Sequence, residues 1–230
     1  MRDVLLFSGG LDSLIAYFYL DNPLCLFVNM HQKYAERELE CVKKMQQEIG
    51  MNLIIDDTTF DFHEVEQDDL TIPNRNAYLA MLASNYGDNI WMAAVDGDYN
   101  HDKTPEIFCA MSMFLSKLKE RPINVKSPFW NMTKTEMIEW YISQGHNKEW
   151  LKMSYSCFTG SKYQCGRCSS CLRRWVGMYN NGVFEDYEED PITWERIPEY
   201  IKRMQARTGK HDSVGRRREF LLAMEKAKKI

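Results

Sequence analysis

Short apolar runs alternate with helical patterns along the first 144 residues, and this alternation is the feature that most limits the fold. The apolar runs occupy residues 4–7, 24–29, 52–56 and 90–95, with a weaker run at 123–126. Helical patterns fill the intervals at residues 13–20, 34–49, 76–86, 105–119 and 133–144. Near-continuous apolar strands separated by helices predict a parallel sheet covered on both faces. We therefore predict an α/β fold with a Rossmann-like, five-stranded parallel sheet.

The first apolar run ends in the stretch LFSGGLDS, residues 6–13. Glycine permits positive φ and lets a ligand approach the backbone closely. The start of the following helix offers unpaired N–H groups and a positive dipole end, which attract phosphate. An ordinary strand–helix turn is the alternative if the glycines are considered alone. The residues by themselves leave this turn and a phosphate site, made by Phe7, Ser8, Gly9, Gly10, Leu11, Asp12 and Ser13, equally open.

The pattern SGG-x-DS differs from the common P-loop, because no lysine follows its glycines. It resembles the pyrophosphate loop of the ATP pyrophosphatase, or PP-loop, superfamily. That resemblance implies that ATP binds with its pyrophosphate in this loop and its α-phosphate open to attack. Adenylation with release of pyrophosphate is then the expected chemistry, rather than transfer of the γ-phosphate.

Length and composition narrow the class of protein further. A chain of 230 residues with 44% hydrophobic residues suits one α/β domain with an appendage. No apolar run approaches the 18 residues that would suggest a membrane span. The chain shows no signal-peptide pattern at its start, so we expect a cytoplasmic protein. Its seven cysteines are an odd number, and four of them cluster, which favours metal binding over disulfides.

The net charge of −4 is unevenly distributed. Residues 201–230 hold ten Lys or Arg against three acidic residues, so the rest of the chain is acidic and unlike a nucleic-acid surface. Nucleic acid or an acidic partner would therefore meet only this basic tail. The run Arg216-Arg217-Arg218 is more typical of the solvated side of a terminal helix.

Four cysteines lie within fifteen residues, with two gaps of two residues. This spacing suits a tetrahedral zinc ion in a closed, structural site, and an iron–sulfur cluster is the main alternative. The expected ligands are Cys157, Cys165, Cys168 and Cys171. We interpret Cys25, Cys41 and Cys109 as small buried hydrophobic residues.

Four stretches in this order resemble 7-cyano-7-deazaguanine synthases, which are PP-loop enzymes of deazaguanine biosynthesis. They are LFSGGLDS, IPNRN (72–76), SPFWNMTKTEM (127–137) and SCFTG…CGRCSSCLRR (156–174). The resemblance covers about residues 4–178. It implies a homodimeric ligase that adenylates 7-carboxy-7-deazaguanine with ATP. Ammonia then gives the amide, and a second activation gives the nitrile.

The resemblance also assigns roles to residues. Ser8 to Ser13 would bind the phosphates, and Asp12 would lie near Mg²⁺. Lys134 would reach the pyrophosphate, where a cation stabilises the charge that builds up on the leaving group. Arg75 would line the crevice with Asn76, and Asp98 would face the substrate or the metal. The candidate catalytic residues are thus Asp12, Arg75, Asp98 and Lys134.

Two loops depart from the family pattern. The family's Tyr-Gly-Gln-Arg-His stretch reads His31-Gln32-Lys33-Tyr34 here, and its Tyr-Pro-Asp-Cys-Arg stretch is replaced by residues 100–105. These loops would lie near the base, so a substrate other than the usual acid, or an enzyme that stops at the amide, stays open. An RNA-thiolating PP-loop enzyme and a non-catalytic zinc module are further alternatives. His31 and His101 are candidate acid–base groups, although a loop histidine is more often a surface residue.

We predict three segments along the chain. Residues 1–155 form the ATP-binding α/β domain, residues 156–184 the zinc-binding region, and residues 185–230 a helical, basic C-terminal extension.

Overall fold

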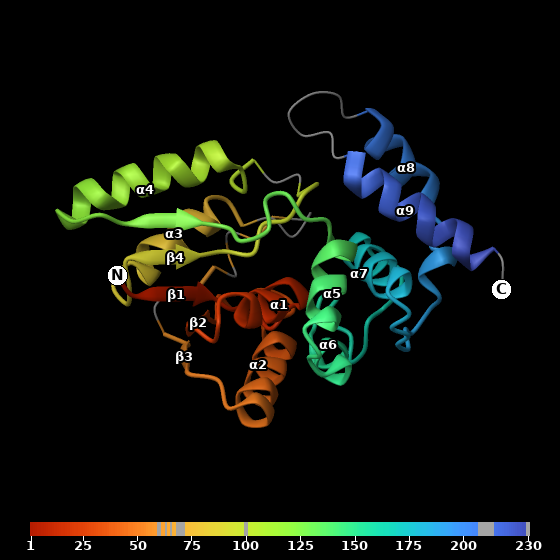
Figure 1. The fold of residues 1–230 in the computed structure, drawn as a ribbon, viewed down its shortest axis with the longest axis horizontal. Helices are drawn as coiled ribbons and strands as arrows, with labels where there is room; N and C mark the ends of the chain where they lie inside the picture. The colour runs from red at the N-terminus through yellow and green to blue at the C-terminus, as the bar shows by residue number, and fades with distance from the viewer. Residues whose placement is uncertain are drawn as a thin grey trace.

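The structure is a computed structural model, and it describes residues 1–58, 61, 62, 64, 66, 67, 72–98, 101–206 and 214–228. Five parallel strands form one sheet in the order β3-β2-β1-β4-β5 (Figure 1). The strands are β1 (Asp3–Leu6), β2 (Leu24–Val28), β3 (Leu53–Asp56), β4 (Asn89–Trp91) and β5 (Asn124–Lys126). The predicted fold class is confirmed.

Helices cover both faces of the sheet, as the apolar strands require. On one face lie α1 (Leu11–Tyr19), α2 (Ala35–Ile49), α5 (Lys134–Ser143) and α6 (Lys148–Met153). The other face is covered by α3 (Arg75–Ala83) and α4 (Pro105–Lys119). Neighbouring residues of β1 point to opposite faces, so Leu5 packs in the first core and Val4 in the second.

Strand β4 is shorter than the sequence predicts. It ends at Trp91, whereas the apolar run continues to Val95. The strand ladder is interrupted because the Ser127 hydroxyl occupies both backbone groups of Ala94. It accepts from the Ala94 N–H at 3.1 Å and donates to the Ala94 C=O at 2.6 Å. Val95 and Phe129 then form an isolated parallel bridge. Residues 96–98 still follow at the carboxyl end of the sheet.

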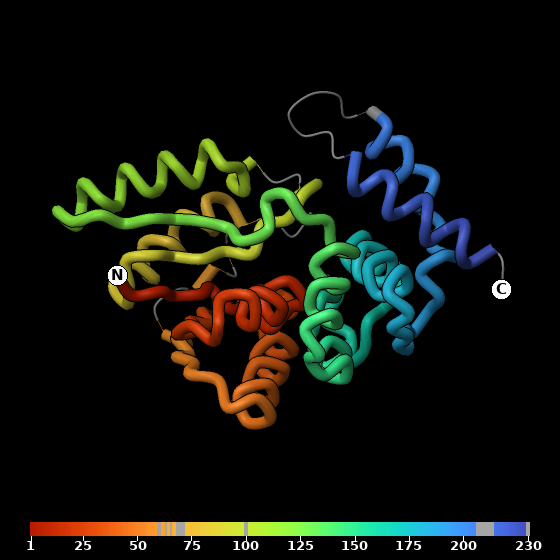
Figure 2. The backbone as a smooth tube through the Cα atoms, in the orientation of Figure 1, coloured from red at the N-terminus to blue at the C-terminus, as the bar shows by residue number. Residues whose placement is uncertain are grey.

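The C-terminal part of the chain has an apolar core of its own. Helix α7 (Ser169–Asn180) packs against α8 (Ile197–Ala206) and α9 (Val214–Ala227) beyond the short 3₁₀ turn Pro191–Thr193. Figure 2 shows the backbone of α8 and α9 running side by side above α7, at the end of the molecule away from β1. Trp175, Ile197 and Phe220 lie in this core.

Across the described ranges, no helix combines the length and the apolar composition that crossing a bilayer requires.

Candidate active site

The loop after β1 is held closed by its own hydroxyl groups. The Ser13 hydroxyl donates to the C=O of Gly10 at 2.9 Å and accepts from the N–H of Ser8 at 3.3 Å. Gly9 has φ of +72°, and a Cβ at this position would lie 2.7 Å from the Val42 side chain on α2. Only glycine therefore lets the loop lie this close to α2.

Helix α1 begins directly after this loop. Gly10 is its N-cap residue and makes no side-chain capping bond. The first amides of α1 are thus uncapped by a side chain, and with the positive end of the helix dipole they favour the binding of an anion. A cavity of about 410 Å³ opens onto this loop and is lined by Ser8, Gly10, Leu11, Asp12 and Ser13.

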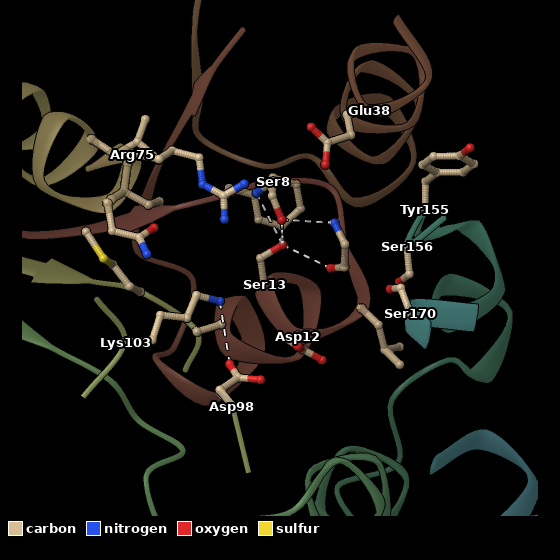
Figure 3. A pocket seen from close by; sticks show the side chains of 18 of the residues that line it. Ser8, Asp12, Ser13, Glu38, Arg75, Asp98, Lys103, Tyr155, Ser156 and Ser170 are labelled. Carbon is tan, nitrogen blue, oxygen red and sulfur yellow. Dashed lines mark hydrogen bonds and ion pairs between the residues drawn. The ribbon is translucent and has the colours of Figure 1, made fainter. Parts of the chain in front are cut away.

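Charged side chains gather at one end of the cavity. The Lys134 ammonium donates to the Asp12 carboxylate. Asp98 accepts from Arg173 at 2.9 Å. It also pairs with Lys103 at 3.5 Å (Figure 3). All five residues line the cavity, and they come from α1, α5, α7 and the loops after β4. The α/β domain and the helix that follows the cysteine-rich segment thus both contribute side chains to one site.

The charges of this cluster decide which groups are ionised. Burial by itself would raise the pKa of Asp98, but the charges of Lys103 and Arg173 outweigh it and hold that pKa well below its usual range. Burial also lowers the pKa of Lys134, and the neighbouring Asp12 carboxylate opposes this shift. Asp98 is therefore an anion at neutral pH, clamped between two cations.

The opposite side of the cavity has a different character. Glu38 and Arg75 point toward each other there, across from Asp98 (Figure 3). Glu38 accepts from the Gln32 side chain at 2.7 Å. Burial raises the pKa of Glu38 to about 8, although Arg75 and Gln32 favour its anion. Tyr34 and Phe158 add aromatic surface, with ring centroids 5.9 Å apart.

The two candidate histidines lie outside the described cavity lining. His31 is 41% exposed and its Nε2 lies 3.8 Å from a carboxylate oxygen of Asp57. His101 is exposed. Asn76 does line the cavity, where its amide donates to Asp102 at 2.8 Å. Asn100, part of one departing loop, lies outside the described residues.

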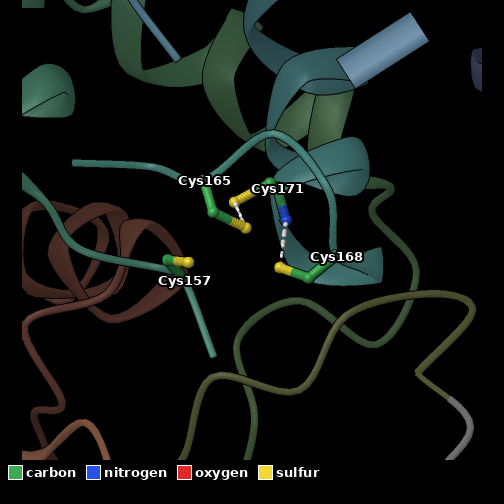
Figure 4. A group of neighbouring side chains, drawn as sticks. All are labelled: Cys157, Cys165, Cys168 and Cys171. Atoms are coloured by element: carbon green, nitrogen blue, oxygen red, sulfur yellow. Dashed lines mark hydrogen bonds between the residues drawn. The ribbon is translucent and has the colours of Figure 1, made fainter. Parts of the chain in front are cut away.

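The four clustered cysteines converge beside the cavity. Figure 4 shows Cys157 set somewhat apart, with its sulfur facing Cys165, Cys168 and Cys171. All four Sγ atoms lie within 4.8 Å of one another, and those of Cys165 and Cys171 are 3.9 Å apart. A tetrahedral zinc ion with Zn–S bonds of about 2.3 Å places its ligands about 3.8 Å apart. The geometry therefore fits a four-thiolate metal site.

Backbone N–H groups support these thiolates. The N–H groups of Thr159, Arg167 and Cys171 each donate to a cysteine sulfur at 3.4 Å. Gly166 has φ of +74°, and a Cβ there would collide with the Glu189 carbonyl. Three of the four cysteines are buried, so the site is closed, as a structural metal requires.

Burial makes two of the remaining cysteines, Cys25 and Cys41, poor nucleophiles. Cys25 is buried in β2, and burial raises the pKa of its thiol. Burial also raises the pKa of the Cys41 thiol to about 11. Cys109 is exposed on α4, so its interpretation as a buried residue is wrong.

Several cavity residues escape sequence reasoning. Arg173 is the easiest of them to predict, because it follows Cys171 by two residues and must therefore lie close to the metal loop. Lys103 and Glu38 carry no motif that separates them from other charged residues. Arg216 belongs to the basic run that we expected to be solvated, yet it is only 5% exposed and lines the cavity.

The parallel sheet, the closed glycine loop and the cation-rich cavity at the carboxyl ends of the strands define an ATP-binding α/β protein of the PP-loop class. The model of the family "Queuosine biosynthesis protein QueC" matches residues 55–182. The chain belongs to this family.

Named relatives agree with this assignment. The 7-cyano-7-deazaguanine synthase 1 of Sulfurisphaera tokodaii is 30% identical over 76% of this chain and 91% of that protein. The 7-cyano-7-deazaguanine synthase of Picrophilus torridus is 30% identical over 87% of this chain and 95% of that protein. The enzyme of the same name from Archaeoglobus fulgidus is 27% identical over 92% of this chain and all of that protein.

Proposed function

We propose that the protein is an ATP-dependent ligase that converts 7-carboxy-7-deazaguanine and ammonia into 7-cyano-7-deazaguanine. The observation that carries this proposal is the family membership together with a cavity in which the PP-loop and Lys134 face each other. The relatives just named share the activity's name.

The first half of the reaction makes an amide. A carboxylate oxygen of the substrate attacks the α-phosphorus of ATP, and pyrophosphate leaves. Ammonia then attacks the acyl carbon, and AMP leaves with the former carboxylate oxygen. The residues from Ser8 to Ser13 hold the phosphates through hydroxyl groups and backbone N–H groups. Lys134 and Arg173 stabilise the charge that develops on the departing pyrophosphate.

The second half dehydrates the amide, whose oxygen leaves as part of AMP. The amide oxygen attacks a second ATP, pyrophosphate leaves, and loss of AMP and a proton forms the nitrile. Both halves need the same phosphate loop and the same leaving-group cations. One cavity therefore serves both activations, provided that the amide stays bound with its oxygen facing the α-phosphate.

Asp12 is the carboxylate best placed to hold Mg²⁺. Its side chain is 25% exposed at the cavity, whereas the 9% exposed Asp98 is already held by Lys103 and Arg173. A magnesium ion would neutralise charge on the phosphates. Lys134, now bonded to Asp12, would then be released toward the pyrophosphate oxygens. Asp98 keeps Arg173 in position beside it.

The far side of the cavity suits the deazaguanine. The pyrimidinone edge of this base carries neighbouring N–H donors, which the Glu38 carboxyl group accepts in pairs once it has released its proton. The Arg75 guanidinium complements an anionic carboxylate of the substrate. Gln32 and Tyr34 belong to the stretch that departs from the family pattern, and both line this side. The departures thus fall where the substrate is recognised.

A bound zinc ion would hold together the segment from Cys157 to Cys171. This segment leads into α7, whose Ser169, Ser170 and Arg173 line the cavity. The metal's role is therefore to fix these side chains, and it takes no part in bond making.

The resemblance implies a homodimer, and α4 offers a surface for it. Met113, Phe114 and Leu118 are 70%, 60% and 55% exposed on this helix. Exposed apolar residues at helical spacing are typical of contact surfaces. Light scattering should give twice the chain mass of 27.2 kDa.

Product analysis tests the proposed function. Purified protein is incubated with Mg-ATP, ¹⁵N-ammonium and 7-carboxy-7-deazaguanine, and the deazaguanine species and AMP are followed by mass spectrometry. We expect labelled nitrile and two AMP per nitrile. Labelled amide with one AMP would mean that the second activation is lost. No conversion by folded, zinc-containing protein would reject this substrate. An Asp12→Asn variant serves as the matched inactive control.

A further inference from the structure

Helix α9 lies outside the segment that the family model matches, yet it contributes to the cavity. The family match ends at residue 182, and α9 begins at Val214. Arg216, in the first turn of α9, is 5% exposed and is among the residues that line the cavity.

The position of Arg216 is fixed by groups on two elements. Its Nη1 donates to the C=O of Gly97 at 2.6 Å, next to Asp98. Its Nη2 donates to the Tyr200 hydroxyl on α8 at 2.7 Å, and its guanidinium lies 5.3 Å from the centre of that ring. Arg216 therefore joins α8 and α9 to the loop that carries Asp98.

A second contact fixes α9 on the other wall of the cavity. The Glu219 side chain accepts from the N–H of Thr135 at 2.9 Å, one residue after Lys134. The Asn180 amide donates to the C=O of Glu219 at 2.9 Å. One turn of α9 thus bridges the loop at Gly97 and the start of α5, the two segments that present Asp98 and Lys134.

The charges around Arg216 point to an anionic ligand. Beside Arg216, this end of the described cavity lining carries three cationic side chains and two carboxylates. The cations are Lys103, Lys134 and Arg173, and the carboxylates are Asp12 and Asp98. The Arg173 Nε is buried and makes no hydrogen bond to any described residue. A polyanion of pyrophosphate size would compensate this excess of positive charge.

We propose that Arg216 binds the β- and γ-phosphates of ATP and the departing pyrophosphate, so that the α8–α9 appendage completes the leaving-group side of the site. The proposal rests on the proposed function only in requiring ATP cleavage between the α- and β-phosphates. Arg216 is thereby a binding residue for the leaving group, supplied by a part of the chain outside the family match.

The test compares Arg216→Met and Arg216→Lys with Arg218→Met. Arg218 neighbours Arg216 on α9, but its side chain is 76% exposed and pairs with Glu136 at 3.4 Å. The measurements are the Kd of Mg-pyrophosphate by calorimetry, its inhibition constant against ATP, and the KM for each substrate. Loss of a charge-assisted bond should weaken pyrophosphate binding about 10- to 100-fold in Arg216→Met. We expect a smaller loss in Arg216→Lys, a change within about twofold in Arg218→Met, and an unchanged KM for ammonium.

Three outcomes would overturn the proposal. The first is an unchanged pyrophosphate Kd in Arg216→Met, which would leave the residue a structural anchor of α9 even if the melting temperature falls. The second is an equal loss in Arg218→Met, which would show only a general charge effect. A Tyr200→Phe variant keeps the guanidinium but removes its hydroxyl partner, so it should weaken pyrophosphate binding by less than Arg216→Met. The third outcome is equal weakening in Tyr200→Phe and Arg216→Met, which would contradict direct contact.

The experiment separates this inference from the proposed function. Pyrophosphate binding is measured without any deazaguanine. Tight binding that depends on Arg216, in an enzyme that makes no nitrile, would support the inference and reject the proposed substrate. Nitrile formation by an enzyme whose pyrophosphate Kd does not depend on Arg216 would support the proposed function and reject the inference.

Discussion

The ammonium of Lys134 bonds the carboxylate of Asp12, although 122 residues separate the two along the chain. The bond joins the first residue of α5 to the first turn of α1, across the cavity mouth of the PP-loop. Each group thus holds the other in place before ATP arrives. In the proposed reaction each group gives up this partner for a ligand, so that Asp12 binds magnesium and Lys134 binds pyrophosphate.

Replacing Lys134 should therefore slow the adenylation step. We expect Lys134→Met to lower kcat about 10²- to 10³-fold, because a preorganised cation no longer meets the charge on the leaving group. AMP release under saturating substrates measures this effect. Lys148→Met, on the exposed start of α6, is the matched control and should retain full activity. A Lys134→Met enzyme with normal kcat would remove the residue from the mechanism.

Removal of one thiolate should destabilise the protein together with the cavity. We expect Cys165→Ser to lose its zinc and to lower the melting temperature by roughly 10 °C or more, because binding energy at a structural zinc site is folding energy. Elemental analysis and calorimetry measure both quantities. Cys109→Ser, at an exposed position of α4, should keep one zinc per chain and the original melting temperature. A zinc content that Cys165→Ser leaves unchanged would contradict the site.

Local patterns allow correct prediction where the interaction is local. Thr133 and Glu136 are three residues apart, and the structure contains the capping box that this spacing predicts. The cysteine spacing likewise predicts a cluster whose ligands come from one short segment. The parallel sheet follows from the repeated alternation of apolar runs and helices. In each case the physical cause lies within a few residues of sequence.

Prediction fails where the partner is distant. Glu38 resembles any charged residue of an amphipathic helix, and only the fold places it opposite Arg75 at the cavity. Arg216 resembles its two arginine neighbours, and its burial depends on Gly97 and Tyr200. The end of β4 depends on a serine from the neighbouring segment. Such contacts are set by tertiary packing, which leaves no periodic signal in the sequence.

A buried ion pair holds the segment between α6 and the metal loop. Arg174 donates to both oxygens of Glu185 at 2.6 and 2.7 Å, and the two side chains are 1% and 7% exposed. The same guanidinium donates to the Ser154 hydroxyl and to the C=O of Leu151. We expect Arg174→Met to cost about 3–5 kcal/mol of unfolding free energy, since it leaves Glu185 buried without its cation.

Urea unfolding measures this cost, and two variants control it. Arg167→Met breaks the ion pair with Glu189, whose partners are 56% and 53% exposed, and should cost about 0–1 kcal/mol. The double variant Arg174→Met/Glu185→Gln removes the unpaired charge and should be more stable than Arg174→Met alone. A single variant that unfolds at the wild-type urea concentration would show that the pair contributes little.

Glu38 should make stability depend on pH near neutrality. Folding raises the pKa of Glu38 from its ordinary 4.5 to about 8, because the carboxylate is buried. The folded state therefore binds this proton more tightly than the unfolded state. The resulting stabilisation is complete below about pH 4.5 and is lost as the pH rises through 8.

Substitution by glutamine removes this dependence. In the absence of ligands, the melting temperature of Glu38→Gln relative to wild type should rise between about pH 5 and pH 9, roughly the range over which the Glu38 pKa is shifted. The reason is that only the wild type must bury a carboxylate at the upper end of this range. Glu36→Gln, at an exposed position of the same helix, should follow the wild-type curve at every pH. If Glu38→Gln also runs parallel to wild type, Glu38 is ionised throughout this range, and Arg75 and Gln32 together compensate its burial.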